Sequence, residues 1–153
     1  MKKLELRLPP ALVALVFACL MYATARWLPV GAFDFFGRGW LQWGLLVLAF
    51  LTGMLAVLRF LREGASLDPH RPEKAKILVT GGVYDYSRNP MYLSLLLLLL
   101  AWGLYLGNAF NTLLAALFVA YMNRFQIGPE ERVLESRFGS AYRRYCTLVR
   151  RWF

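Results

Sequence analysis

The stretch PMYLSLLLLLLAWGLYLGNAFNTLLAALFVAYMNRF, residues 90–125, holds two apolar runs on either side of Gly107-Asn108. The first run covers residues 91–106 and the second covers residues 109–125. A helix needs about 20 apolar residues, at ~1.5 Å of rise each, to cross the hydrocarbon core of a bilayer. Both runs are shorter than that, so they are expected to borrow flanking residues or to lie in locally thinned bilayer. So short a connection allows only an antiparallel helical hairpin. The stretch therefore predicts two paired membrane-spanning helices whose outer ends share one face of the membrane.

Two further apolar blocks, at residues 10–28 and 40–61, are also long enough to span a bilayer. Hydrophobic residues make up 59% of the 153 positions, which leaves too little polar surface for a soluble domain. We therefore expect one unit over residues 1–153. Its predicted class is all-α: a polytopic membrane protein with four transmembrane helices, a cytosolic loop and an amphipathic C-terminal helix.

The first apolar block has a second interpretation as a secretory signal. Lys2 and Lys3 precede it, and Ala23-Thr24-Ala25 near its end resembles a cleavage site. The block is long for the apolar core of a signal, so we expect a retained helix.

Lysine and arginine gather in alternate connections. On one side lie Lys2, Lys3 and Arg7 before the first block, Arg62, Arg71, Lys74, Lys76 and Arg88 after the second, and Arg132, Arg137, Arg143, Arg144, Arg150 and Arg151 after the fourth. The opposite connections hold Arg38, with Arg26 at a helix end. Because basic loops stay on the cytosolic side, both termini are predicted to be cytosolic. A short single-unit chain with no organelle signal predicts a bacterial inner membrane. The formal net charge of +9 then suits anionic lipid headgroups rather than nucleic acid.

The two long polar segments are predicted to share the cytosolic side. The loop from Arg62 to Asn89 is expected to be irregular, with a turn at Gly81-Gly82. From Pro129 onward, charged and apolar residues alternate at helical spacing, which predicts an amphipathic helix on the membrane or over the loop. The two cysteines have no metal-site or disulfide spacing, and no metal is expected.

Two polar clusters are candidates for a functional site. One is the stretch Thr80–Tyr92, rich in tyrosine, and the other is Glu130-Glu131. The helical hairpin brings both to one membrane face. Carboxylates can meet an ammonium group, and tyrosine faces attract a sulfonium, so S-adenosylmethionine is a suitable ligand. Three other interpretations stay open: Arg88 as a headgroup anchor, the glutamates as favourable charge at a helix start, and the tyrosines as an interfacial belt.

The same residues resemble a known family. Thr80-Gly81-Gly82-Val83-Tyr84, Ser87-Arg88-Asn89-Pro90-Met91-Tyr92, Glu130-Glu131, and Leu134 with Phe138-Gly139, Tyr142 and Tyr145 are similar to the isoprenylcysteine carboxyl methyltransferases. Phospholipid N-methyltransferases share part of this pattern. The resemblance runs from about residue 76 to 153. It implies an integral membrane enzyme that binds S-adenosylmethionine in a cytosol-facing pocket and admits a lipid-like acceptor between its helices.

The resemblance also implies roles for individual residues. The expected cofactor-binding residues are the strand-like stretch Lys76, Ile77, Leu78 and Val79, then Tyr84, Asn89, Pro90, Met91, Tyr92 and Glu130, with Glu131 beside them. Eukaryotic members have histidine where this chain has Asn89. They also have an arginine at the position of Gln126, which weakens the case for a prenylcysteine carboxylate as substrate. We expect Arg88 or Arg124 to orient an anionic acceptor, and Gln126 to make a polar contact nearby.

The predicted function is therefore S-adenosylmethionine-dependent methyl transfer to a membrane-dissolved acceptor: an isoprenylcysteine-like carboxylate, a thiol or a phospholipid amine. One alternative is an NADPH-dependent, sterol-type membrane reductase whose Arg71, Lys74 and Lys76 hold the 2′-phosphate. Another is a non-catalytic module that binds membrane lipids. His70, the one histidine, is expected at the surface. The oligomeric state is open.

Overall fold

The computed structural model describes residues 6, 8–28, 31–63 and 77–153, in which helices are joined by short turns and loops. The elements are α1 (Pro10–Trp27), α2 (Arg38–Arg62), η3 (Gly82–Asp85), α3 (Pro90–Leu106), α4 (Phe110–Met122), η4 (Asn123–Ile127), α5 (Gly128–Phe138) and α6 (Ser140–Leu148). Within the described residues there is no β-strand, and β-type pairing is limited to a bridge between Ala32 and Asn108. The all-helical prediction is confirmed.

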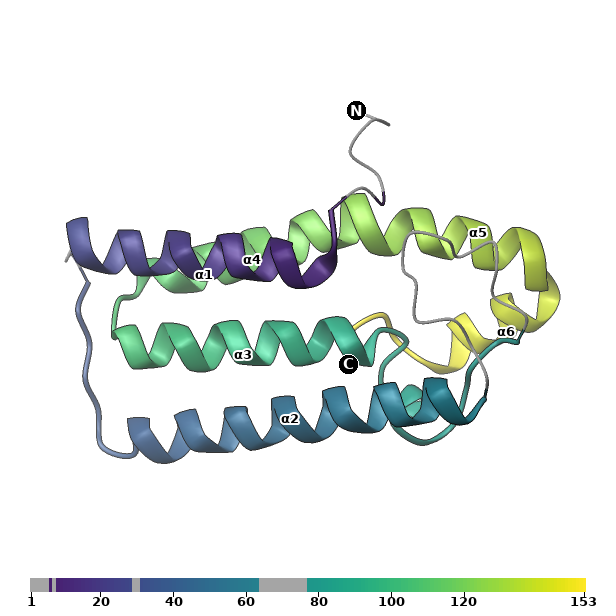
Figure 1. Ribbon diagram of the computed structural model, residues 1–153, viewed down its shortest axis with the longest axis horizontal. Helices are drawn as coiled ribbons and strands as arrows, with labels where there is room; N and C mark the ends of the chain where they lie inside the picture. The colour runs from purple at the N-terminus through teal and green to yellow at the C-terminus, as the bar shows by residue number, and fades with distance from the viewer. Residues whose placement is uncertain (1–5, 7, 29–30, 64–76) are drawn as a thin grey trace.

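Helices α1, α2, α3 and α4 run side by side, with α3 between α2 and the pair α1–α4 (Figure 1). The main core fills the space among α1, α3 and α4, where Met21, Phe118 and Met122 are fully buried. Phe17 meets the edge of Phe118 at a ring separation of 5.6 Å. Apolar side chains on three helices therefore hold α3 in place, and its first turn carries part of the candidate site.

Helix α2 approaches α3 through small residues. Its buried positions are Ala49, Thr52 and Ala56, and a Cβ added to Gly53 would lie 3.0 Å from the Ser94 hydroxyl oxygen. Small side chains allow two helices to pack with their backbones close together. The contact aligns α2 with α3, so the ends of both helices reach the candidate site together.

Replacing Gly53 with valine is expected to lower the thermal midpoint of the purified protein. The added side chain would push α2 away from Ser94, and overpacking of this kind costs ~1–3 kcal/mol. Gly44→Val is the matched control, because a Cβ at Gly44 has nothing within 4 Å. Equal midpoints for the two variants would contradict the close packing of α2 on α3.

The turn between α3 and α4 confirms the predicted tight hairpin. Gly107 has φ +64, a left-handed conformation that favours glycine, and its carbonyl accepts the Phe33 amide at 2.9 Å. The Asn108 side chain donates from Nδ2 to the Leu28 carbonyl at 2.8 Å. The connection between α1 and α2 is thus fastened to the α3–α4 turn, which fixes this end of the bundle.

The fourth helix does not stop at Phe125, as the sequence predicted. Helix α4 passes through the π-helical turn η4 into α5 without leaving helical geometry (Figure 1). Pro129 has no N–H to donate to the Phe125 carbonyl, and the Leu6 amide donates to this carbonyl at 3.0 Å instead. Glu130 and Glu131 therefore lie within a continuous helix, which removes the interpretation of favourable charge at a free helix start.

The expected single amphipathic tail helix is two helices. Gly139, at φ +52 and ψ −121, breaks the chain between α5 and α6. Helix α6 turns back toward the loop before α3, where the Tyr145 hydroxyl donates to the Tyr84 carbonyl at 2.7 Å. Residues 77–79, expected to be strand-like, are part of this loop and have no strand partner among the described residues.

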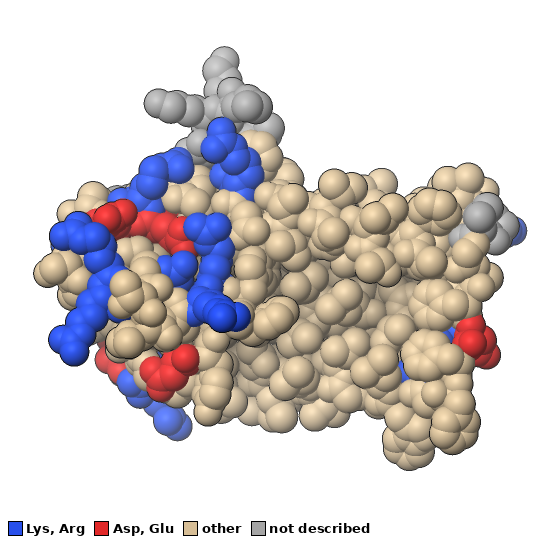
Figure 2. Space-filling view, turned by 180° about the vertical axis from the view of Figure 1, so that it is seen from behind, with Lys and Arg blue, Asp and Glu red and all other residues tan. Residues whose placement is uncertain are grey.

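Two helices, α1 and α2, are long and apolar enough to cross a membrane, while α3 is apolar but shorter. Only 22% and 17% of the residues in their apolar windows are buried, so these are not core helices of a soluble protein. Figure 2 shows charged side chains gathered at the α5–α6 end and a broad uncharged zone along the bundle. The surface is that of a membrane protein.

Candidate functional site

The first turn of α3 meets the first turn of α5. The Tyr92 hydroxyl donates a hydrogen bond to Glu130 Oε1, and Arg88 Nη2 lies 3.1 Å from Glu131 Oε1. The predicted juxtaposition of the two polar clusters is confirmed. It follows from the hairpin, because α3 starts and the α4–α5 helix emerges at the same end of the bundle.

Glu130 is a largely buried carboxylate without a compensating cation among the described residues. Burial raises its pKa from 4.5 to about 7, and the charge of Glu131 adds to the effect. The hydrogen bond from Tyr92 lowers the pKa but offsets only part of the rise. Burial and the charges of Tyr145 and Glu130 also raise the pKa of the Tyr84 hydroxyl. The site thus holds a carboxylate beside two phenol rings.

Glu131 has the opposite environment, because it is paired with two arginines. Both Arg88 and Arg151 contact its carboxylate, and the side chains of Arg88, Glu131 and Arg151 are 13%, 19% and 38% exposed. The hydrogen bonds that Arg151 donates to the Glu131 carboxylate raise the pKa of the Arg151 guanidinium. Arg88 Nε is buried with no hydrogen-bond partner in the described part of the chain. The two neighbouring glutamates therefore differ: the arginines neutralise the charge of Glu131, whereas no cation of the described residues pairs with Glu130.

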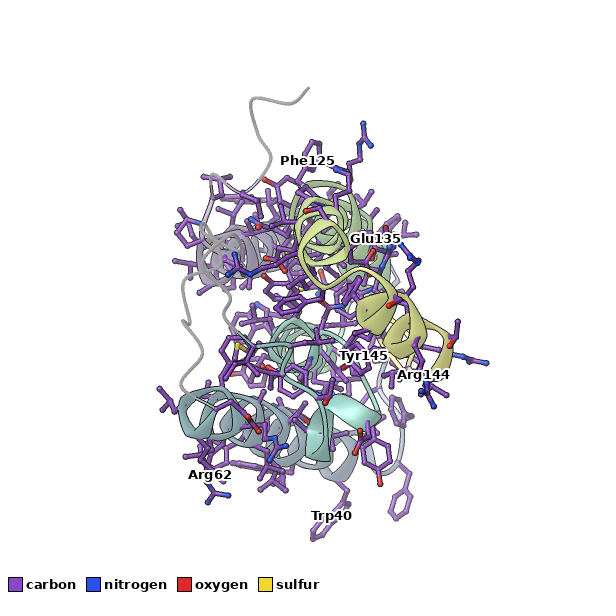
Figure 3. The ribbon with its side chains drawn as sticks, turned by 90° about the vertical axis from the view of Figure 1, so that its right-hand side faces the viewer. Trp40, Arg62, Phe125, Glu135, Arg144 and Tyr145 are labelled. Atoms are coloured by element: carbon purple, nitrogen blue, oxygen red, sulfur yellow. The ribbon has the colours of Figure 1, made fainter. Side chains whose placement is uncertain are left out.

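The tyrosines of the cluster are interior groups. Tyr84 and Tyr92 are 5% and 8% exposed, which excludes an interfacial belt for these two. Figure 3 looks along the bundle from the α6 end, where Tyr145 points inward and Arg144 points away. Burial raises the pKa of Tyr145, whose hydroxyl holds the Tyr84 carbonyl. Helix α6 thus forms a wall over the loop that carries Tyr84.

Arg59, near the end of α2, holds the other side of this loop. Its Nε and Nη2 donate to the Thr80 carbonyl at 3.2 and 2.9 Å, and Nη2 lies 3.0 Å from Glu63 Oε1. A Cβ on Gly81 would lie 3.0 Å from Arg59 Nη2, so only glycine admits this contact without a shift. The loop is therefore held between α2 and α6.

Replacing Arg59 with methionine is expected to speed hydrogen exchange at the Tyr84 and Tyr86 amides about fivefold. These amides donate to the Gly81 and Val83 carbonyls, directly beyond the tether at Thr80. Loss of a partly exposed charged hydrogen bond is worth ~1 kcal/mol. Exchange read by mass spectrometry checks this, with Arg62→Met as the control because Arg62 points away from the bundle (Figure 3). Equal rates in both variants would contradict the tether.

Several of the remaining predicted residues lie around the cluster, and others do not. Asn89 donates to the Arg151 carbonyl at 2.9 Å, Pro90 is buried, and Met91 packs against Tyr84 and Val79. Leu78 packs on the tyrosines of α6, whereas Ile77 is exposed. Lys76, His70, Arg71 and Lys74 lie outside the described residues.

Arg124 and Gln126 lie on the π-helical turn. Gln126 is fully buried, and its Nε2 donates to the Leu8 carbonyl at 2.5 Å while its Oε1 has no partner among the described residues. Arg124 is exposed. No hydrogen bond or ion pair among the described residues joins either side chain to Glu130, so their predicted roles at the acceptor stay predictions.

Sequence reasoning missed Arg59 and Arg151. Each contributes to the site through a partner remote in sequence, and no local motif marks either one. Within the described ranges, no group of three or more histidine, cysteine, aspartate or glutamate residues is arranged to hold a metal ion.

A family model for phospholipid methyltransferases matches residues 37–141, which include α2, α3, α4 and the glutamate pair. The chain belongs to the phospholipid methyltransferase family. Residues 37–75, part of this match, carried no diagnostic pattern in the sequence. The resemblance to the isoprenylcysteine and phospholipid methyltransferases is confirmed.

Two related proteins show how much of the chain is similar to known sequences. An uncharacterized protein of Haemophilus influenzae is 58% identical over 62 residues, covering 40% of this chain and 98% of that protein. The protein-S-isoprenylcysteine O-methyltransferase of Schizosaccharomyces pombe is 31% identical over 106 residues, covering 63% of this chain but 45% of the yeast enzyme. No solved structure matches the chain.

Proposed function

We propose that the chain is an S-adenosylmethionine-dependent methyltransferase whose cofactor lies between the start of α3 and α5. The observation that carries the proposal is Glu130. Its carboxylate is largely buried, its partner is the Tyr92 hydroxyl, and no cation of the described residues offsets its charge. A buried charge is stabilised when it is paired, so a cationic ligand suits this site.

The charged and aromatic groups of the site suit the charged groups of S-adenosylmethionine. Its sulfonium and ammonium groups would meet the Glu130 carboxylate and the faces of Tyr84 and Tyr92. Its carboxylate, or an anionic acceptor, would meet the buried Nε of Arg88, which lacks a partner in the described part of the chain. The charges of the cluster thus suit a ligand that carries both signs. When bound, the cofactor supplies a methyl group activated by the sulfonium.

The protein's own residues would hold, align and shield the reactants. Tyr84, Asn89, Tyr92 and Glu130 fix the cofactor side, while the wall formed by α6 keeps water away. Arg88 would orient an anionic acceptor. Alignment and water exclusion supply much of the rate in a displacement of this kind. A carboxylate or thiolate acceptor needs no base, so a lipophilic anion is the simplest acceptor, while a phospholipid amine would have to lose a proton.

The proposed topology has four transmembrane helices with both termini in the cytosol. Leu6 and Leu8 contact the π-helical turn, and Arg150 contacts the start of α3, all at the charged end of the bundle. At the opposite end, Trp27, Phe36, Trp40 and Trp43 are exposed in the manner of an interfacial aromatic belt. These features support a site at the cytosolic face of the membrane, which we propose to be a bacterial inner membrane.

S-adenosylmethionine is expected to raise the thermal midpoint of the detergent-purified protein, while NADPH is not. A ligand at a hundred times its Kd stabilises the folded state by ~2.7 kcal/mol. Stabilisation by NADPH alone would favour a sterol-type reductase, and stabilisation by neither would favour a lipid-binding module. Methyl-labelled cofactor added with a membrane lipid extract would then identify the acceptor.

A further inference from the structure

Residues 150–152 cross over the start of α3. The Arg150 carbonyl accepts the Arg88 amide at 3.0 Å, and the Arg151 carbonyl accepts Asn89 Nδ2 at 2.9 Å and the Ser87 hydroxyl at 3.3 Å. These bonds engage the three residues that lead into Pro90. The conformation of the α3 entry is thus set by backbone carbonyls far along the chain.

Two side chains of the same segment donate hydrogen bonds to the helix formed by α4, η4 and α5. Arg151 donates to both carboxylate oxygens of Glu131, with Nε at 3.1 Å from Oε1. Trp152 Nε1 donates to Asn123 Oδ1 at 3.0 Å, and its ring packs against the main core. Asn123 and Glu131 are eight positions apart, about two helical turns, so both lie on similar sides of the helix.

We propose that Arg151 is a positioning residue, and that residues 150–152 form a clamp that holds the entry of α3 against α5. Helix α5 extends beyond the start of α3, so the two helices do not run alongside each other (Figure 1). Their register depends on side-chain links, namely Tyr92–Glu130 and Arg88–Glu131, together with the clamp.

The clamp gives Glu131 a role different from that of Glu130. Glu131 binds Arg88 from the α3 entry and Arg151 from the clamp, so one carboxylate joins three segments. A partly buried network of this kind holds geometry better than an isolated surface pair. The effect on the cofactor rests on the proposed function, whereas the effect on the α3 entry does not.

The test compares Arg151→Gln with Arg150→Gln, which removes the same charge from an exposed neighbour. Hydrogen exchange at the Arg88 amide is expected to speed up about fivefold in Arg151→Gln and to be unchanged in Arg150→Gln. The S-adenosylmethionine Kd is expected to rise about fivefold in Arg151→Gln only. Arg151→Lys should recover part of both effects, because it restores the charge without the two-pronged contact.

Two further measurements separate positioning from general loss of folding. In a Glu131→Gln background, Arg151→Gln should add little, as expected when two residues act through one contact. Trp152→Phe, which keeps an aromatic ring but loses the N–H that bonds to Asn123, should also speed exchange at the Arg88 amide. Unchanged exchange in both Arg151→Gln and Trp152→Phe would overturn the clamp. Faster exchange in a protein that binds no S-adenosylmethionine would leave the clamp standing and refute the proposed cofactor.

Discussion

Replacing Glu130 with glutamine is expected to weaken S-adenosylmethionine binding by about thirtyfold or more. Glutamine keeps the size of the side chain and an acceptor for the Tyr92 hydroxyl, but it removes the one charge that the described site leaves uncompensated. Loss of one partner from a buried charge pair costs ~2–5 kcal/mol, and each 1.4 kcal/mol is tenfold in Kd. Calorimetric titration of detergent-purified protein measures the change.

The matched control is Glu135→Gln, on the same helix. Glu135 is half exposed, points to the outside of the bundle (Figure 3) and lies 3.6 Å from Arg143. Its loss should leave the Kd unchanged. The unliganded Glu130→Gln variant should melt at least as high as the wild type at neutral pH, because it no longer buries a charge. Unchanged affinity in a folded Glu130→Gln variant would refute the cofactor site.

Much of the site's architecture could be predicted from local sequence. Two apolar runs and a Gly107-Asn108 turn determine a hairpin, and a hairpin brings its two outer ends together. That argument places Tyr92 near Glu130 without any knowledge of side-chain positions. The difference between Glu130 and Glu131 could not be predicted, because it depends on where Arg151 lies after the chain reverses at Gly139.

The helix through Pro129 likewise depends on a contact remote in sequence that could not be predicted. Proline usually ends or kinks a helix, because it leaves a carbonyl one turn earlier without a donor. Here the Leu6 amide supplies that donor, and a π-helical turn absorbs the change in spacing. Neither compensation is visible near Pro129 in the sequence. Local rules predicted the helix boundary wrongly because a distant backbone group satisfied the freed carbonyl.

Binding of S-adenosylmethionine is expected to tighten about tenfold between pH 6 and pH 8. The pKa of Glu130 is raised from 4.5 to about 7, mainly by burial, with Glu131 adding to the rise and Tyr92 opposing it. A cation binds the ionised carboxylate, whose fraction grows from ~0.1 to ~0.9 over this interval. Titrations at several pH values measure the slope, and Glu130→Gln should give a flat profile.

The stability of the unliganded protein should move in the opposite direction. Because the pKa of Glu130 is higher in the folded state, the folded chain keeps a proton that the unfolded chain has released above pH 4.5. The contribution of Glu130 to stability therefore falls as the pH rises from about 4.5 through 7. As the pH rises, the affinity for S-adenosylmethionine should increase while the stability of the unliganded protein decreases. Loss of both trends in Glu130→Gln would identify Glu130 as a buried carboxylate that binds a cationic ligand. The same affinity slope in Glu130→Gln would assign the titration to another group.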